Sequence, residues 1–254
     1  MEKTFEKEKS WKDYLSVTNF MIVILLIFYL LDKYLPLPKD YTGFNCWDNE
    51  LPPAVNYIFG WCGGLLMNSM AVCDTIVGGM DVYRQFTCMF LHADILHLIA
   101  NLMGLYFIGN YAEKKYGWWL TYIIYFLVGF MQYLITDPIF AAIAPEKFAE
   151  IYAMPSCGAS GGIFALIGAS LAALIFDIKG FKKIGKPTLI ISAIYGVLTT
   201  YVVSFGWTTI CHNVSLILGL VFGVVIILPF FLLKKGKFVT TNNSNIESDI
   251  DKKY

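Results

Sequence analysis

One serine and one histidine in this chain have the type and the placing that hydrolytic chemistry requires. Ser160 lies in Gly158-Ala159-Ser160-Gly161, at the start of an apolar run, and His212 lies near the start of a later one. Small neighbours leave the serine hydroxyl uncovered, and free N–H groups at a helix start can stabilise a developing oxyanion. A histidine inside a membrane span is costly and is by default a functional candidate. A neutral imidazole facing Ser160 would take its proton as general base.

Each of these signals also has a structural interpretation. The glycines around Ser160 could serve close packing between helices, and His212 could bond a loop at the membrane surface. The five residues from Gly158 also match the G-x-S-x-G nucleophile elbow of α/β-hydrolases, but the preceding strand and soluble sheet which that elbow needs are not visible in the sequence. No acidic residue lies near His212, so the sequence favours a Ser-His dyad over a triad.

Two further polar residues could assist a nucleophilic serine. His97 and Asn101 stand four apart, hence on one face of a helix, and two side-chain donors beside Ser160 would complete an oxyanion hole. The alternative is a hydrogen-bonded pair that only joins helices. His92 lies nearer the membrane surface, and we expect it to orient the adjacent loop.

Composition places these residues in a membrane. The 254 residues are 57% hydrophobic, and 19 basic residues balance 19 acidic ones, so nucleic acid is not an expected partner. The mean hydropathy is +0.60. The six cysteines lack metal-like C-x-x-C spacing, and no metal or cofactor is expected; packed thiols are favoured over a loop disulfide.

The apolar runs are long enough to cross a hydrocarbon core of ~30 Å as helices. The sequence therefore predicts an all-α polytopic membrane protein with six transmembrane helices. Their expected ranges are Val17–Tyr34, Thr87–Asn110, Trp118–Thr136, Ser160–Phe176, Pro187–Phe205 and Ile210–Leu233.

The remaining segments flank or interrupt this membrane domain of residues 17–233. Residues 1–16 form an expected cytoplasmic tail, and the first apolar run is retained because no cleavage site follows it. Residues 35–86 form an extracytoplasmic loop whose apolar piece, 54–67, is expected to be interfacial or re-entrant. Residues 234–254 are polar and are expected to be a disordered cytoplasmic tail.

The basic residues set the orientation. Most of the 19 fall in the segments that become cytoplasmic when the N-terminus is cytoplasmic, which also places the C-terminus there. Ser160, His212 and His97 then all lie in the extracytoplasmic half of the membrane. We expect a multi-pass protein of the cell membrane with its site facing outward.

Several motifs match a known family. Tyr83-Arg84 precedes the second span, the stretch from Phe90 to Asn101 holds both of its histidines, and Glu113-Lys114-Lys115-Tyr116-Gly117 follows it. With the Gly-Ala-Ser-Gly turn and the histidine of the last span, these residues make the chain resemble the rhomboid intramembrane serine proteases over roughly residues 81–233.

The resemblance implies a six-helix rhomboid-like bundle and a role for each site residue. Ser160 would be the nucleophile, His212 the base, and His97 with Asn101 the oxyanion donors. Phe164 would lie against the catalytic imidazole. The remaining supporting positions are Gly158, Gly161, His92 and Arg84.

One departure from the family pattern leaves a second register open. The family usually continues its histidine as His-x-x-Gly-x-x-x-Gly, and here Ser215 replaces the first glycine. Aligning Asn213 with an asparagine that often precedes the histidine would put Leu216 in the catalytic position and make the protein an inactive relative. We favour His212, because Ser215, Gly219 and Gly223 then form a stripe of small residues that lets the last span approach the fourth.

The predicted function is therefore an intramembrane serine endopeptidase. Its partners would be the lipid bilayer and membrane-spanning protein substrates, which by the resemblance enter between spans two and five. Rival interpretations are an inactive protein that binds transmembrane helices and a small transporter, for which the expected internal symmetry is not apparent. The sequence assigns neither a natural substrate nor an oligomeric state.

Overall fold

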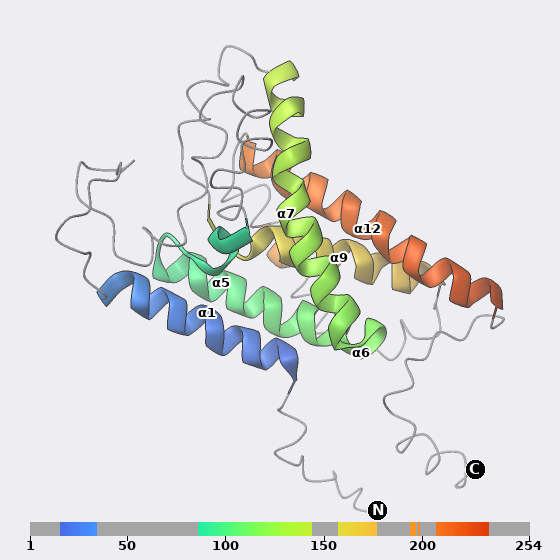
Figure 1. Cartoon of the computed structure of the whole chain (residues 1–254), viewed down its shortest axis with the longest axis horizontal. Coiled ribbons are helices and arrows are strands. Elements are labelled where there is room, and N and C mark those ends of the chain that lie inside the picture. The colour runs from blue at the N-terminus through green and yellow to red at the C-terminus, as the bar shows by residue number, and fades with distance from the viewer. Residues whose placement is uncertain are drawn as a thin grey trace, which may run out of the picture.

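The structure, a computed structural model, describes residues 16–34, 86–143, 157–176, 194–196, 198 and 207–233. Every regular element in these ranges is helical, so the all-α prediction is confirmed (Figure 1). The elements are α1 (Val17–Tyr34), the 3-10 turn η3 (Cys88–Phe90), α5 (Ile95–Gly104), the π-helical segment η4 (Leu105–Gly109), α6 (Asn110–Tyr116), α7 (Trp118–Ile143), α9 (Ser160–Phe176) and α12 (Trp207–Leu233).

Four helices in the described ranges are long and apolar enough to cross a membrane: α1, the continuous run from α5 to α6, and parts of α7 and α12. With 17 residues, α9 is shorter. The expected fifth span, 187–205, lies mostly outside the described residues, as do the tails 1–15 and 234–254 and the loop 35–85. The protein is a polytopic helical bundle, and the count of six helices stays a prediction.

The second crossing helix differs from its expected range of 87–110. Residues 88–90 form η3, and the helix begins only at Ile95, because the Asp94 side chain accepts a hydrogen bond of 2.8 Å from the His97 N–H and caps it. It continues through η4 to Tyr116 and ends at Gly117, whose φ of +78° suits glycine. The expected first and fourth spans match α1 and α9, whereas α7 extends to Ile143 and α12 begins at Trp207.

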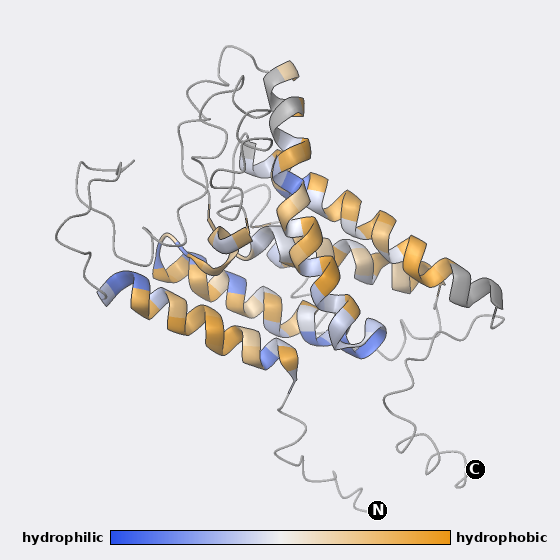
Figure 2. Ribbon diagram, in the orientation of Figure 1, coloured by the Kyte–Doolittle hydropathy of each residue, from blue (hydrophilic) through white to orange (hydrophobic). Residues whose placement is uncertain are grey.

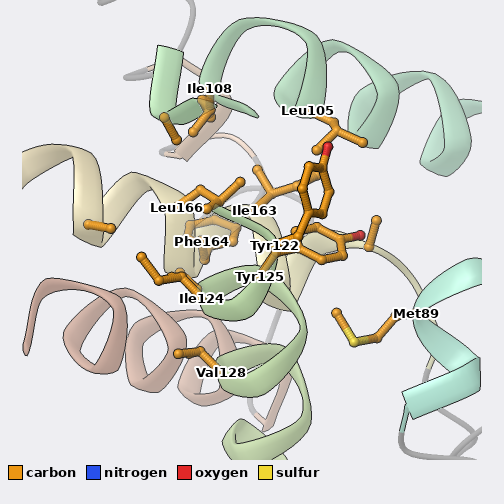
Figure 3. Close-up of a cluster of buried hydrophobic side chains, with 14 of the residues drawn as sticks. Met89, Leu105, Ile108, Tyr122, Ile124, Tyr125, Val128, Ile163, Phe164 and Leu166 are labelled. Carbon is orange, nitrogen blue, oxygen red and sulfur yellow. The ribbon is translucent and has the colours of Figure 1, made fainter. Parts of the chain in front are cut away.

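Helix α9 is the centre of the bundle. It packs against α12 and α7 and contacts α5, η4 and α6 as well. Eleven of its residues are buried. Phe164 and its neighbours Ile163 and Leu166 meet the aromatic side chains of Tyr122 and Tyr125 from α7 in the core (Figure 3).

Apolar side chains also cover the outside of the bundle. Phe20 on α1, Trp118 on α7 and Val225 on α12 are all more than half exposed. Figure 2 shows the same apolar colouring along these three helices. Such surfaces are unfavourable in water but suit contact with lipid chains.

Small residues let α9 and α12 approach closely, as the four-residue spacing predicted. A Cβ atom added at Gly219 would overlap the Ala165 backbone, and one at Gly223 would lie 2.8 Å from the Ala169 Cα. A Cβ at Gly168 would overlap the Leu216 carbonyl. This contact aligns α12 on the helix that begins with Ser160.

Helix α1 is fastened to α6 by one carboxylate. Glu113 accepts hydrogen bonds from the N–H groups of Val17 and Thr18 and from the Thr18 hydroxyl, at 2.7 to 3.1 Å. A carboxylate at a helix N-terminus satisfies free N–H groups and opposes the positive end of the helix dipole. The bundle therefore holds α1 beside the helix that carries His97 and Asn101.

Candidate active site

Ser160 is the first residue of α9 and follows a tight glycine turn. Gly158 has a φ of +123°, which side-chain-bearing residues rarely adopt. Its N–H donates to the Cys88 carbonyl at 3.0 Å, which ties the turn to η3. A Cβ atom at Gly158 would lie 2.8 Å from the His97 ring. Both the backbone angle and the lack of space therefore require glycine here.

His212 lies beside Ser160. The His212 Nε2 and the Ser160 Oγ are 3.0 Å apart, although 52 residues separate them in the chain. With its proton on Nδ1, the neutral imidazole accepts the serine hydroxyl at Nε2. Leu216, the alternative from the second register, is one turn further along α12, where its carbonyl faces Gly168.

The His212 ring is held between helices. The Phe164 ring, one turn after Ser160 on α9, stacks on it with centroids 4.3 Å apart and an interplanar angle of 13°. His212 itself is only 4% exposed. Within the described part of the chain its Nδ1 has no hydrogen-bond partner. The arrangement is a serine and a histidine oriented by stacking, with no carboxylate of the described residues behind the imidazole.

The predicted oxyanion donors lie beside Gly158 of the serine turn. Asn101 is buried and is held by two hydrogen bonds: its Nδ2 donates to the His97 carbonyl at 2.9 Å, and its Oδ1 accepts from the Tyr195 hydroxyl at 3.1 Å. Measured from a Cβ position on Gly158, the His97 Nε2 is at 2.8 Å and the Asn101 Nδ2 at 3.8 Å. Both nitrogens therefore flank the turn that carries Ser160.

His92 contacts His97 and not the serine. The two rings meet edge to face with centroids 5.1 Å apart. His92 precedes α5, outside the membrane-spanning helices, and burial followed by the nearby His97 lowers its pKa to about 3. It is therefore neutral at physiological pH. Its expected role in orienting the adjacent loop stays a prediction, and Arg84 lies outside the described residues.

Gln132 on α7 is a residue near the site that the sequence analysis missed. The Ser215 hydroxyl on α12 donates to the Gln132 Oε1 on α7, with the two oxygens 2.5 Å apart. A Cβ atom at Gly161 would overlap the Gln132 amide. Ser215, which stands where the family usually has glycine, thus has a polar partner, and that partner packs against Gly161 of the serine turn.

Tyr195 is the second residue that the sequence analysis missed. Its ring lies 5.8 Å from that of Phe164, and its hydroxyl reaches Asn101. A single tyrosine in an apolar run gives no signal of its own. Among the described residues, no group of three or more metal-ligating side chains could hold an ion.

The arrangement has the parts that acyl transfer requires. A hydroxyl is hydrogen-bonded to an imidazole that can take its proton, and two side-chain nitrogens that could stabilise a developing oxyanion lie beside Gly158 of the same turn. The N-terminus of α9 adds its own free N–H groups on the same side. Asn101 and His212 are buried in the bundle, where electrostatic interactions are stronger than in water, while Ser160 and His97 are partly exposed.

Comparison with known proteins gives a consistent result. The family model of the Rhomboid domain matches residues 79–232. The chain is 34% identical to RHOMBOID-like protein 1 of Arabidopsis thaliana over 113 residues, which cover 44% of the chain and 26% of that protein. It is 28% identical to Rhomboid-like protease 2 of Toxoplasma gondii over 146 residues, 57% of the chain and 47% of the relative.

A third similar protein has a different name. The chain is 32% identical over 125 residues to Inactive RHOMBOID-like protein 8 of Arabidopsis thaliana, which covers 49% of the chain and 31% of the relative. The chain thus spans between about a quarter and a half of the length of these three relatives. Their names include both a protease and an inactive protein.

Proposed function

The chain belongs to the rhomboid family, and we propose that it is an intramembrane serine endopeptidase with Ser160 as nucleophile and His212 as general base. The observation that carries this proposal is the 3.0 Å separation of the Ser160 Oγ and the His212 Nε2, with the imidazole buried and the serine partly exposed. A polar pair that only joined helices would not need a tight glycine turn before the serine and two further side-chain nitrogens beside that turn.

The geometry supports a two-step reaction. In the first step the Ser160 Oγ bonds to the substrate carbonyl carbon while the His212 Nε2 takes the hydroxyl proton. The resulting oxyanion is stabilised by the His97 and Asn101 nitrogens, and His212 then gives its proton to the leaving amine as the peptide bond breaks. In the second step a water, deprotonated by His212, attacks the acyl carbon, and His212 returns that proton to the Ser160 Oγ as the acyl–Oγ bond breaks.

We propose membrane-spanning proteins as the substrates. Exposed apolar side chains surround the described bundle, so a substrate from the lipid can approach its outer helices without crossing a polar surface. A peptide bond inside a regular helix is shielded by its own hydrogen bonds, and a segment with helix-breaking residues exposes that bond more readily. The lysine distribution favours a site on the extracytoplasmic side of the cell membrane, with both termini cytoplasmic.

A second candidate function is binding of transmembrane helices without cleavage. The similarity to Inactive RHOMBOID-like protein 8 and the serine at position 215 favour it. On this alternative the Ser160–His212 contact would serve packing alone. The two functions differ in one measurable property, the production of cleaved substrate.

The test is cleavage of a reporter that carries one transmembrane helix destabilised by glycine and proline. Wild type is compared with Ser160→Ala, His212→Ala and the control Ser170→Ala, which removes another buried serine of α9. The proposal predicts product with wild type and Ser170→Ala only. Cleavage that survives either Ser160→Ala or His212→Ala would contradict the dyad. No cleavage by folded wild type across several reporters would favour helix binding.

A further inference from the structure

Tyr195 is a buried residue to which the catalytic steps above assign no role. It is 7% exposed and contacts three residues around the site. Its ring approaches that of Phe164, its hydroxyl donates to Asn101, and a Cβ atom at Gly104 would lie 2.8 Å from the ring. The glycine of α5 thus leaves the room that the tyrosine ring fills, one turn from Asn101.

The two partners of the Asn101 amide determine which way it faces. The His97 carbonyl can only accept a hydrogen bond, so the NH₂ group of Asn101 must point toward it. The carbonyl oxygen of the amide then faces the Tyr195 hydroxyl, which donates to it. Without that hydroxyl, the oxygen end of the amide would be buried with one partner fewer. The hydrogen bond of the amide that remains among the described residues lies within α5.

The orientation of this amide matters for the oxyanion. The NH₂ group has two hydrogens, and the His97 carbonyl takes one of them. The other is left for a second acceptor, because the described residues give this nitrogen no further acceptor. The Nδ2 that carries it lies 3.8 Å from the Cβ position of Gly158, beside the serine turn. A flipped or rotated amide would present its oxygen to the developing negative charge, which repels it and removes a donor.

We propose that Tyr195 is a positioning residue that holds the Asn101 amide with its free N–H toward the oxyanion formed at Ser160. This inference rests on the proposed function, since it concerns the same site. Tyr195 does not touch the reacting atoms in this mechanism; it acts through Asn101. The bond joins residues 94 positions apart, so it also fixes the helix segment around Tyr195 to α5 beside the site.

The kinetic test compares two tyrosine-to-phenylalanine substitutions, each of which removes only a hydroxyl group. Tyr195→Phe should lower kcat about tenfold, corresponding to about 1.4 kcal/mol, and leave KM unchanged, because the donor acts on the transition state. The matched control is Tyr125→Phe, since the Tyr125 hydroxyl is buried and has no hydrogen-bond partner among the described residues. In an Asn101→Ala background, Tyr195→Phe should cause no further loss. An unchanged kcat, or the same tenfold loss without Asn101, would overturn the proposal.

A second readout does not depend on cleavage. Protein labelled with ¹⁵N at asparagine gives side-chain NH₂ signals, and the pair that disappears in Asn101→Ala belongs to Asn101. Tyr195→Phe should shift or broaden that pair, and Tyr125→Phe should not. If wild type proves inactive but the signals respond in this way, the proposed function fails and the positioning of Asn101 stands. If they do not respond, the positioning claim is wrong whatever the activity.

Discussion

Adding one methyl group at Gly219 should separate the two helices that carry the catalytic pair. In Gly219→Ala the new Cβ would lie 2.6 Å from the Ala165 carbonyl carbon and 2.7 Å from its Cα. Both are backbone atoms, which no rotamer change can move aside. Since carbon atoms pack at about 3.5–4.0 Å, α12 must move away from α9 by roughly 1 Å at this level.

The displacement has a consequence for stability and a larger one for cleavage. Forcing an extra methyl group into a packed contact costs about 1–3 kcal/mol. His212 stands on the same helix, two turns before Gly219, and its 3.0 Å bond to Ser160 crosses the same helix pair. A misplacement of about 1 Å at reacting groups lowers a catalysed rate about a hundredfold. We therefore expect a folded protein of reduced stability that cleaves at a small fraction of the wild-type rate.

The assay combines thermal unfolding in detergent with cleavage kinetics of the transmembrane reporter. Gly196→Ala is the matched control, because no described atom lies within 4 Å of its Cβ position, and it should be neutral in both measurements. If Gly219→Ala is as stable as wild type and cleaves the reporter at the wild-type rate, the close α9–α12 contact does not support the dyad. If Gly196→Ala has the same effects as Gly219→Ala, the effects come from replacing a glycine and not from the α9–α12 contact.

Three further substitutions probe separate contacts. Ser215→Ala leaves the Gln132 oxygen without its interhelical donor and should lower the free energy of unfolding by about 0.6–2 kcal/mol; an unchanged melting temperature would count against that bond. Glu113→Ala removes the carboxylate that caps α1 and should lower the free energy of unfolding by about 1–3 kcal/mol. Proteolysis or hydrogen exchange near the α1 N-terminus should become faster. Glu113→Gln keeps an oxygen acceptor and should retain part of the stabilisation. Phe164→Leu removes the ring stacked on His212. The loss of an aromatic contact worth about 0.5–1.5 kcal/mol should lower kcat several-fold with little change in KM. A rise in KM alone would contradict an orienting role for the ring.

The sequence predicts the elements that have strong local signals. The range of α9 follows from the Gly-Ala-Ser-Gly turn that precedes it and the uninterrupted apolar run behind it. Helix α1 likewise begins and ends where polar residues bound its apolar run. The pairing of Ser160 with His212 could be predicted because a histidine is unusual in a membrane helix and glycines flank the serine. In the structure the Ser160 Oγ and the His212 Nε2 lie 3.0 Å apart, and the catalytic roles stay a proposal.

Other features depend on partners that are distant in the chain. The start of α5 was predicted too early, because apolar residues continue through η3 and only the Asp94 cap sets the helix start. Gln132 and Tyr195 gave no signal, since their importance comes from bonds to residues 83 and 94 positions away. A single polar residue in an apolar run has no periodicity that would reveal which neighbour it meets.

The central claim is that Ser160 is a nucleophile activated by His212, and covalent labelling tests it most directly. Purified protein is treated with a fluorophosphonate probe, which bonds only to activated serines, and the adduct is located by mass spectrometry of peptides. The account predicts labelling at Ser160, its loss in His212→Ala, and its retention in Ser170→Ala. Absence of an adduct on Ser160 in folded wild type, or equal labelling in His212→Ala, would contradict the account.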